Sequence, residues 1–163
     1  MTRFLTMMIA MLAMVVAAPT PAATAEPPVS AESGLAIRGY DPVAYFTAGK
    51  PQEGKAEHSF VYEGATWRFA SAESLAAFKR DPAQYAPQFG SYCAWAVSQH
   101  YLAPGDPNYW KIVDGRLYLN ANARAKELWE ADQADAIKRG HANWPAVLSD
   151  NQDGQGRSNG PPR

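Results

Sequence analysis

The sequence predicts an α+β fold in which two β-hairpin–helix units surround one small core and a short central helix carries a cysteine. Two segments alternate apolar and polar residues and break at a glycine-containing turn, a pattern typical of β-hairpins. Each segment is followed by apolar residues at helical spacing behind a polar cap. Aromatic residues make up 12% of the chain, which favours an aromatic-rich core.

The first unit is expected to be a hairpin at about 58–70 followed by a helix at about 72–80. His58 opens an alternating run that leads to a Glu63-Gly64 turn, after which a second alternating run returns. Ser71 is a residue type that commonly caps the N-terminus of a helix. Because His58 is in phase with the aromatic residues of its strand, we expect its side chain to face inward.

The second unit is expected to be a hairpin at about 110–119 followed by a helix at about 122–139. Its Asp114-Gly115 turn is among the strongest hairpin signals that a sequence offers. The helix is expected to begin at an asparagine cap, Asn120 or Asn122, and to end at Gly140, because glycine is common directly after the last helical turn.

Cys93 lies between the two units and is the single cysteine of the chain. Gly90 and Ser91 precede a plausible short helix over Tyr92 to Gln99, with Ser91 as its N-cap. Cys93 would then lie in the first turn, where unpaired N–H groups and the helix dipole favour a thiolate. We therefore expect a depressed thiol pKa, and the alternative is a buried thiol packed among aromatic residues.

Residues 1–25 have the pattern of an export signal. Arg3 is followed by an apolar run of about fifteen residues, which is short for a bilayer span. Ala23-Thr24-Ala25 offers the small residues that a signal peptidase recognises, with cleavage before Glu26. We expect a periplasmic protein without a stable membrane anchor, and a retained anchor is the alternative.

The rest of the chain is expected to hold one domain. Residues 26–33 are a polar, proline-containing segment that we expect to be a flexible lead, and the folded domain should span 34–148. Residues 149–163 have no large apolar side chain and are expected to form a disordered tail. A formal net charge of −1 gives no electrostatic argument for binding nucleic acid.

Three histidines are candidate partners of Cys93. His58 on an inward strand face could form a two-ligand metal site with a cysteine in the first turn of a helix. His100 is seven residues after Cys93, about 10.5 Å along a helix, and is a partner only if the helix breaks before it. His141 is expected at the surface. Asp41, like the other aspartates that precede a proline, is expected to form a turn. We expect no organic cofactor.

The chain resembles an exported single-domain member of the YHS domain family, in which relatives can carry selenocysteine. The resemblance covers almost the whole folded region. The motifs that carry it are, in order, Gly39-Tyr40-Asp41-Pro42-Val43-Ala44-Tyr45-Phe46, Glu57-His58-Ser59-Phe60 with Gly64, Trp67 and Phe69, Pro82 with Tyr85, Pro87, Phe89, Gly90 and Tyr92-Cys93-Ala94, Trp110 to Asn120, and Asn143-Trp144-Pro145.

The resemblance implies a link to metal ions, copper among them, because YHS domains occur in copper-transporting ATPases. Selenocysteine at the position that matches Cys93 would imply chemistry at that atom. Many YHS domains carry two cysteines that are regarded as ligands, whereas this chain has one, and its five methionines all lie in residues 1–14. A metal site would therefore need Cys93 with histidine or with a second chain.

Three functions remain open from the sequence. The first is binding of one thiophilic ion, Cu or Zn, through Cys93 with His58 and, less directly, His100. The second is a thiol redox or peroxide-reactive protein in which Cys93 is the catalytic group and an external thiol or redox partner resolves it. The third is a partner-binding domain whose thiol is buried and structural. An enzymatic activity is not clearly indicated.

Overall fold

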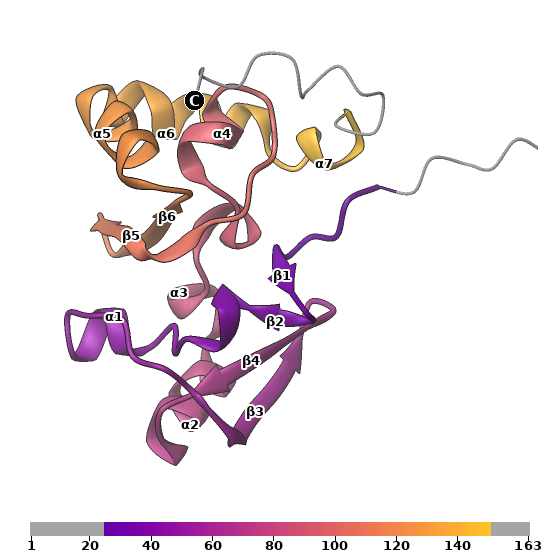
Figure 1. Ribbon diagram of the computed structural model, residues 1–163, viewed down its shortest axis with the longest axis vertical. Coiled ribbons are helices and arrows are strands. Elements are labelled where there is room, and N and C mark those ends of the chain that lie inside the picture. Colours follow the sequence, from indigo (N-terminus) through magenta and orange to yellow (C-terminus); the bar gives the residue numbers. More distant parts are fainter. Residues whose placement is uncertain (1–24, 151–163) are drawn as a thin grey trace, which may run out of the picture.

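The computed structural model describes residues 25–150, which form two halves stacked one above the other (Figure 1). The lower half holds a four-stranded sheet with the order β1-β2-β4-β3, and the upper half holds a two-stranded sheet of β5 and β6. Helices accompany both sheets, so the α+β class is confirmed. No helix among residues 25–150 is long and apolar enough to cross a membrane.

The first predicted hairpin–helix unit lies in the lower half. Strands β3 (Lys55–Tyr62) and β4 (Ala65–Phe69) pair antiparallel around the Glu63-Gly64 turn, where both residues have positive φ. Helix α2 (Ala72–Arg80) follows, and the Ser71 hydroxyl accepts a hydrogen bond from the N–H of Ser74 at 3.2 Å, as expected for the N-cap. The sheet is completed by two short strands, β1 (Ala31–Glu32) and β2 (Leu35–Ala36).

The second hairpin forms the sheet of the upper half. Strands β5 (Asp106–Val113) and β6 (Arg116–Asn120) pair antiparallel around the predicted Asp114-Gly115 turn. The strand β5 begins four residues before the expected start because Asp106 pairs with Asn120 across an irregularity in the register.

The single helix expected over 122–139 is two helices. Helix α5 (Ala123–Ala131) ends at Asp132, whose backbone leaves the helical region, and α6 (Gln133–Asn143) begins directly after it. Gly140 lies inside α6 and does not end it. A Cβ atom at Gly140 would lie 2.6 Å from the ring of Phe89, so this glycine permits close packing rather than a helix end.

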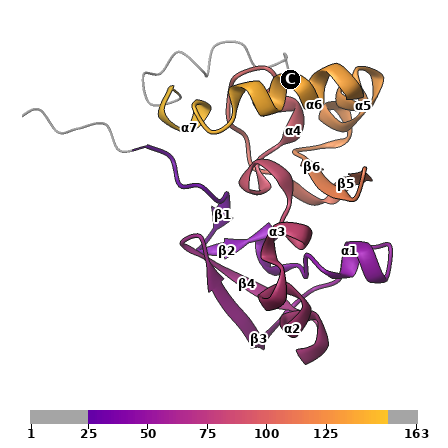
Figure 2. The ribbon, with the colours of Figure 1, turned by 180° about the vertical axis from the view of Figure 1, so that it is seen from behind.

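Short helical segments connect and flank the two halves. The lower half contains η1 (Ile37–Gly39) and α1 (Ala44–Thr47), and the chain rises through α3 (Pro82–Tyr85) and η2 (Gln88–Ser91) to α4 (Ala94–Ser98). Helix α7 (Val147–Asp150) lies beside α6 in the upper half, as seen from both sides (Figures 1 and 2).

The buried side chains form two main clusters and a small third one instead of a single core. The lower cluster is built around Trp67 and Phe78, whose rings are 5.1 Å apart, and the upper cluster contains Phe89 and Trp129. Leu119 of β6 belongs to the lower cluster although its strand lies in the upper half. The clusters are therefore joined through β6, and the third cluster surrounds Cys93.

The segment expected to be a flexible lead, residues 26–33, packs on the domain. The N–H of Glu26 donates to the carbonyl of Leu148 at 2.9 Å, and the N–H of Ser30 donates to the carbonyl of Gly90 at 2.7 Å. Val29 between them is buried in the lower cluster. The apolar side chain of Val29 explains why this polar segment is held. The export signal over 1–25 falls outside the described residues except for Ala25, and most of the expected tail over 149–163 does too.

Candidate functional site

Cys93 is itself the N-cap of α4, one position earlier than the first turn in which we expected it. The N–H of Ala96 donates to the Cys93 sulfur at 3.5 Å. Ser91, the expected cap, instead ends η2, and its backbone has a positive φ of 68°. The expected eight-residue helix shortens to Ala94–Ser98 because Tyr92 and Cys93 are extended and the N–H of Cys93 pairs with the carbonyl of Ala103.

Asn120 at the end of β6 is the polar side chain that forms a hydrogen bond with the sulfur of Cys93. Its Oδ1 accepts from the N–H of Trp95 at 3.1 Å and from the thiol of Cys93 at 3.7 Å. Both Cys93 and Asn120 are buried. Within the described residues the Asn120 Nδ2 has no hydrogen-bond partner. The sequence offered Asn120 as one of two possible caps of the following helix, and Asn122 is the one that caps it. The contact of Asn120 with α4 was not predicted, because a strand-end asparagine carries no sign that it reaches a residue 25 positions away.

The thiol of Cys93 has a raised pKa, which corrects the expectation of a depressed one. Burial raises the pKa, and the backbone N–H groups of Ala96, Ala121 and Trp95 lower it by a smaller amount. The expectation rested on the helix terminus alone. Removing the sulfur from water disfavours the thiolate more strongly than these N–H groups favour it. Cys93 is therefore a protonated thiol at neutral pH.

His58 lies in β3 of the lower half, whereas Cys93 lies at the start of α4 in the upper half (Figure 1). The structure does not bring them together. We predicted that His58 faces the same side of β3 as Phe60 and Tyr62. All three side chains are partly covered, whereas the residues between them are exposed. Its charged neighbour is Glu73, whose pKa is lowered by its own backbone N–H, by Ser71 and, as a smaller effect, by His58.

His100 also finds a partner other than Cys93. The helix α4 ends at Ser98, so the break that this candidate required is present, and His100 itself has a positive φ of 63°. Its Nε2 lies 3.1 Å from Oδ2 of Asp150 at the end of α7, and both side chains are about half exposed. His141 lies at the surface of α6 as expected, with its ring 5.1 Å from the ring of Phe89.

Comparison with protein families gives one match. Residues 43–89 match the family model of the YHS domain. The chain is similar to the YHS domain over this segment. The match covers the first hairpin, α2 and α3 and ends four residues before Cys93. Searches among curated proteins and among solved structures give no match.

The YHS domain is associated with the handling of heavy metals, copper in particular. The donor groups among residues 25–150 do not fit a metal ion bound at Cys93. Among residues 25–150 there is no group of three or more His, Cys, Asp and Glu side chains that could hold an ion. A thiophilic ion requires a thiolate, and the raised pKa of the buried Cys93 opposes it.

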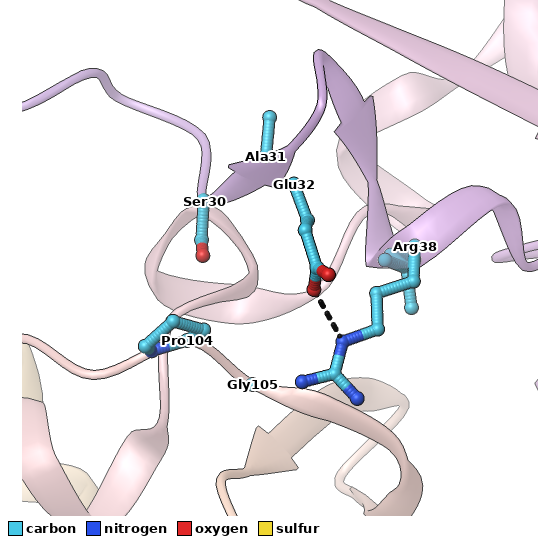
Figure 3. Close-up of a pocket in the computed structure, with 7 residues that line it drawn as sticks. Ser30, Ala31, Glu32, Arg38, Pro104 and Gly105 are labelled. Carbon is cyan, nitrogen blue, oxygen red and sulfur yellow. Dashed lines mark hydrogen bonds and ion pairs between the residues drawn. The ribbon is translucent and has the colours of Figure 1, made fainter.

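Several hollows on the surface of residues 25–150 are large enough to hold a ligand. One has a volume of about 240 Å³ and lies between β1 and the segment before β5 (Figure 3). Arg38 reaches into it and pairs with Glu32 at 2.8 Å and with Asp106 at 2.7 Å. Two carboxylates thus neutralise its guanidinium, so this hollow offers little attraction to an anion.

Another hollow is a groove of about 410 Å³ between the two halves. It is lined by residues of the lead, the β3–β4 turn, α3, η2, β6 and the α6–α7 region. We call it the interhalf groove. Sequence reasoning did not find it, because its walls come from segments that are far apart in the chain.

Proposed function

We propose that this protein is an exported, partner-binding YHS module of heavy-metal handling in which the thiol of Cys93 is structural. The observation that carries the proposal is that the buried sulfur of Cys93 makes hydrogen bonds within the domain. It caps α4 by accepting the N–H of Ala96 and donates to the buried Asn120. The export signal expected in residues 1–25 would direct the module to the periplasm.

Several features support a structural thiol over a metal-binding one. Metal coordination by cysteine needs an accessible sulfur that loses its proton, and Cys93 is 1% exposed with a raised pKa. The histidine that the sequence offered as a second ligand, His58, lies in the other half. The side chains around the sulfur are Ala96, Ala125 and their apolar neighbours, which form a packing environment.

The role of the thiol can be tested on untagged protein by two measurements. Alkylation of Cys93 by iodoacetamide at neutral pH is expected to be very slow in the native protein and fast in guanidinium chloride. Equilibrium dialysis against Zn²⁺, and anaerobically against Cu⁺, is expected to give the same bound metal for the native protein and Cys93→Ser. One ion per native chain that is lost in Cys93→Ser would contradict the proposal, as would rapid native alkylation.

A second candidate function is a peroxide-reactive thiol. The observation in its favour is that backbone N–H groups of Trp95, Ala96 and Ala121 surround the sulfur and would stabilise a thiolate once the site opened. The thiolate would attack one oxygen of hydrogen peroxide and break the O–O bond. The sulfur becomes a sulfenic acid by losing two electrons, and water leaves after protonation. An external thiol would then form a mixed disulfide and release a second water.

Trapping of the sulfenic acid with dimedone distinguishes this candidate. If Cys93 is structural, native protein treated with a small excess of peroxide shows no dimedone adduct, whereas protein unfolded in urea and treated identically does. An adduct that forms in the native protein faster than global unfolding would favour the redox function.

A further inference from the structure

We propose that removal of the export signal creates a charged anchor for the lead, which is the new α-amino group of Glu26 bound to α7. The proposal rests on the export proposed above and assigns a role to the chain end that cleavage would form. The lead rises from β1 toward α7 in both views (Figures 1 and 2). The N–H of Glu26 donates to the carbonyl oxygen of Leu148 at 2.9 Å, so the nitrogen that cleavage would release is held by the fold.

The predicted cleavage site coincides with the point where the chain meets the domain. Ala25 is exposed, whereas Glu26 is partly covered and Val29 is buried. Hydrolysis of the peptide bond between Ala25 and Glu26 consumes one water and leaves a carboxylate on Ala25 and an amino group on Glu26. An α-amino group has an ordinary pKa of about 7.7–8.0, so it carries a proton and a positive charge at neutral pH and below. Cleavage would therefore charge the first residue that contacts the domain.

The carbonyl that receives this nitrogen belongs to the end of a helix. Helix α7 has the four residues Val147–Asp150, and carbonyl groups in the last turn of a helix have no partner inside the helix. These carbonyls carry a partial negative charge, which a nearby cation stabilises. Hydrogen bonds from a charged donor are roughly twice as strong as those from a neutral one. The α-ammonium of the mature chain should therefore bind Leu148 more strongly than the amide N–H of the uncleaved chain does.

Two further bonds attach the lead to the upper half. The Tyr92 hydroxyl donates to the carbonyl of Pro27 at 3.0 Å, and the N–H of Ser30 donates to the carbonyl of Gly90 at 2.7 Å. Chain ends fray unless they are tied down, and fraying is the lowest-energy opening of a native protein. A stronger bond at Glu26 should therefore reduce the opening of the bonds that follow it, and the mature lead should be held more firmly than that of the precursor.

The anchor can be tested on residues 26–163 with a free and with an acetylated amino group, at about pH 6.5, where the free amine is charged. Acetylation keeps an N–H that can donate to Leu148 and removes the positive charge. Hydrogen exchange of the Ser30 amide should be about threefold to tenfold faster after acetylation. The amide of Ser149, which is attached to the Leu148 carbonyl, should change its chemical shift. Amides of β3 should exchange equally in both forms, which shows that global stability is not the cause.

A chain that begins at Ala25 is the matched variant. It carries an α-ammonium too, but the charge moves by one residue, about 3.8 Å along the chain, and an amide N–H again faces Leu148. Its Ser30 amide should exchange like that of the acetylated protein. The position of the charge and not its mere presence would then account for the protection of the lead.

Two results would overturn the anchor. They are equal exchange of Ser30 in the free and acetylated proteins, and equal protection in the chains that begin at Ala25 and at Glu26. N-terminal sequencing of exported protein separates this proposal from the export on which it rests. A chain that retains Met1 would refute both, whereas a cleaved chain with a first residue other than Glu26 would refute the anchor alone. The alkylation and metal measurements on Cys93 do not depend on any of these results.

Discussion

The sulfur of Cys93 is subject to two opposing physical effects. Backbone N–H groups at the start of α4 point toward it and stabilise a negative charge, while burial removes the water that would stabilise that charge better. Burial is the larger effect, so the proton stays on the sulfur. The thiol can then donate to Asn120 and accept from Ala96, which satisfies both groups inside the fold.

A raised pKa of Cys93 predicts a loss of stability at alkaline pH. The folded protein keeps this proton at pH values where the unfolded chain has released it, so stability falls as pH rises. The contribution is fully present below about pH 8.5, the ordinary thiol value, and is lost above it by at most about 1.4 kcal/mol per pH unit. Urea unfolding of native protein from about pH 7 to about pH 9.5 measures this loss.

Cys93→Ser is the matched control, because a serine hydroxyl can cap α4 and does not titrate in this range. The free energy of unfolding of the variant should therefore change less with pH than that of the native protein. Buried tyrosines titrate above this window. The pKa of Tyr92, for example, is raised to about 12 by burial and by Glu26. If the free energy of unfolding of the native protein and of Cys93→Ser changed with pH in the same way, the pKa of the Cys93 thiol would not be raised.

At the scale of elements, Gly140 shows how α6 is fitted to η2. Alanine is normally better than glycine inside a helix by about 1 kcal/mol. At Gly140 the added Cβ atom would lie 2.6 Å and 2.9 Å from two carbon atoms of the Phe89 ring, which is buried and bounded by other aromatic rings. The helix therefore needs glycine here to approach η2.

Gly140→Ala is expected to destabilise the protein by about 1–3 kcal/mol, because overpacking against Phe89 exceeds the gain in helix propensity. The measurement is the free energy of unfolding in urea. Lys138→Ala, at an exposed position of the same helix, should change it by less than about 0.5 kcal/mol. A Gly140→Ala protein as stable as the native one would show that the ring moves aside freely.

Asp41 connects two elements of the lower half and is fully buried. Its Oδ1 accepts from the N–H of Val43 at 2.8 Å before α1, and its Oδ2 accepts from the N–H of Ala70 at 2.9 Å between β4 and α2. The sequence indicated a turn-forming aspartate, which the first of these bonds confirms. The second bond, to a residue 29 positions away, makes the same carboxylate a tertiary contact.

Asp41→Asn should therefore be costly. The amide has one acceptor oxygen and would place an N–H₂ group against a backbone donor, so we expect a loss of about 2–3 kcal/mol in thermal or urea unfolding. Asp81→Asn is the control, since Asp81 caps α3 through a single bond to the N–H of Gln84 and asparagine caps a helix equally well. If the free energy of unfolding fell by the same small amount in both variants, the carboxylate of Asp41 would not stabilise the contact between the start of α1 and the β4–α2 connection.

At the scale of the whole molecule, the lead joins the two halves. Val29 packs in the lower cluster, while the N–H groups of Glu26 and Ser30 bond to carbonyls of α7 and η2 in the upper half. The same segment supplies one wall of the interhalf groove through Pro28. A protein cleaved before Glu26 would keep all of these contacts, whereas one that started at Gly34 would lose them.

A chain that begins at Gly34 is expected to be less stable than one that begins at Glu26 by about 2–3 kcal/mol, roughly the value of one buried valine and its neighbouring bonds. Val29→Ala in the longer chain should account for about 1–2 kcal/mol of this. Val61→Ala serves as the control, because Val61 is 67% exposed. Equal urea midpoints for the two chains would indicate that the lead does not contribute to the fold.

The elements that depend on neighbouring residues could be predicted from the amino-acid sequence. The turns at Glu63-Gly64 and Asp114-Gly115 and the cap at Ser71 follow from local backbone preferences, and they were predicted correctly. The YHS resemblance was predicted from the order of such motifs and is confirmed over residues 43–89.

The surroundings of each of these residues depend instead on tertiary contacts. The break at Asp132, the position of Gly140 against Phe89 and the burial of Val29 depend on segments that meet in space. The chemistry of Cys93 also depends on segments that meet in space. Its position at a helix start was predicted to within two residues, but its pKa depends on the water that β6 and α5 exclude. Desolvation is a property of the packed environment, and the spacing of residues along a chain does not encode it.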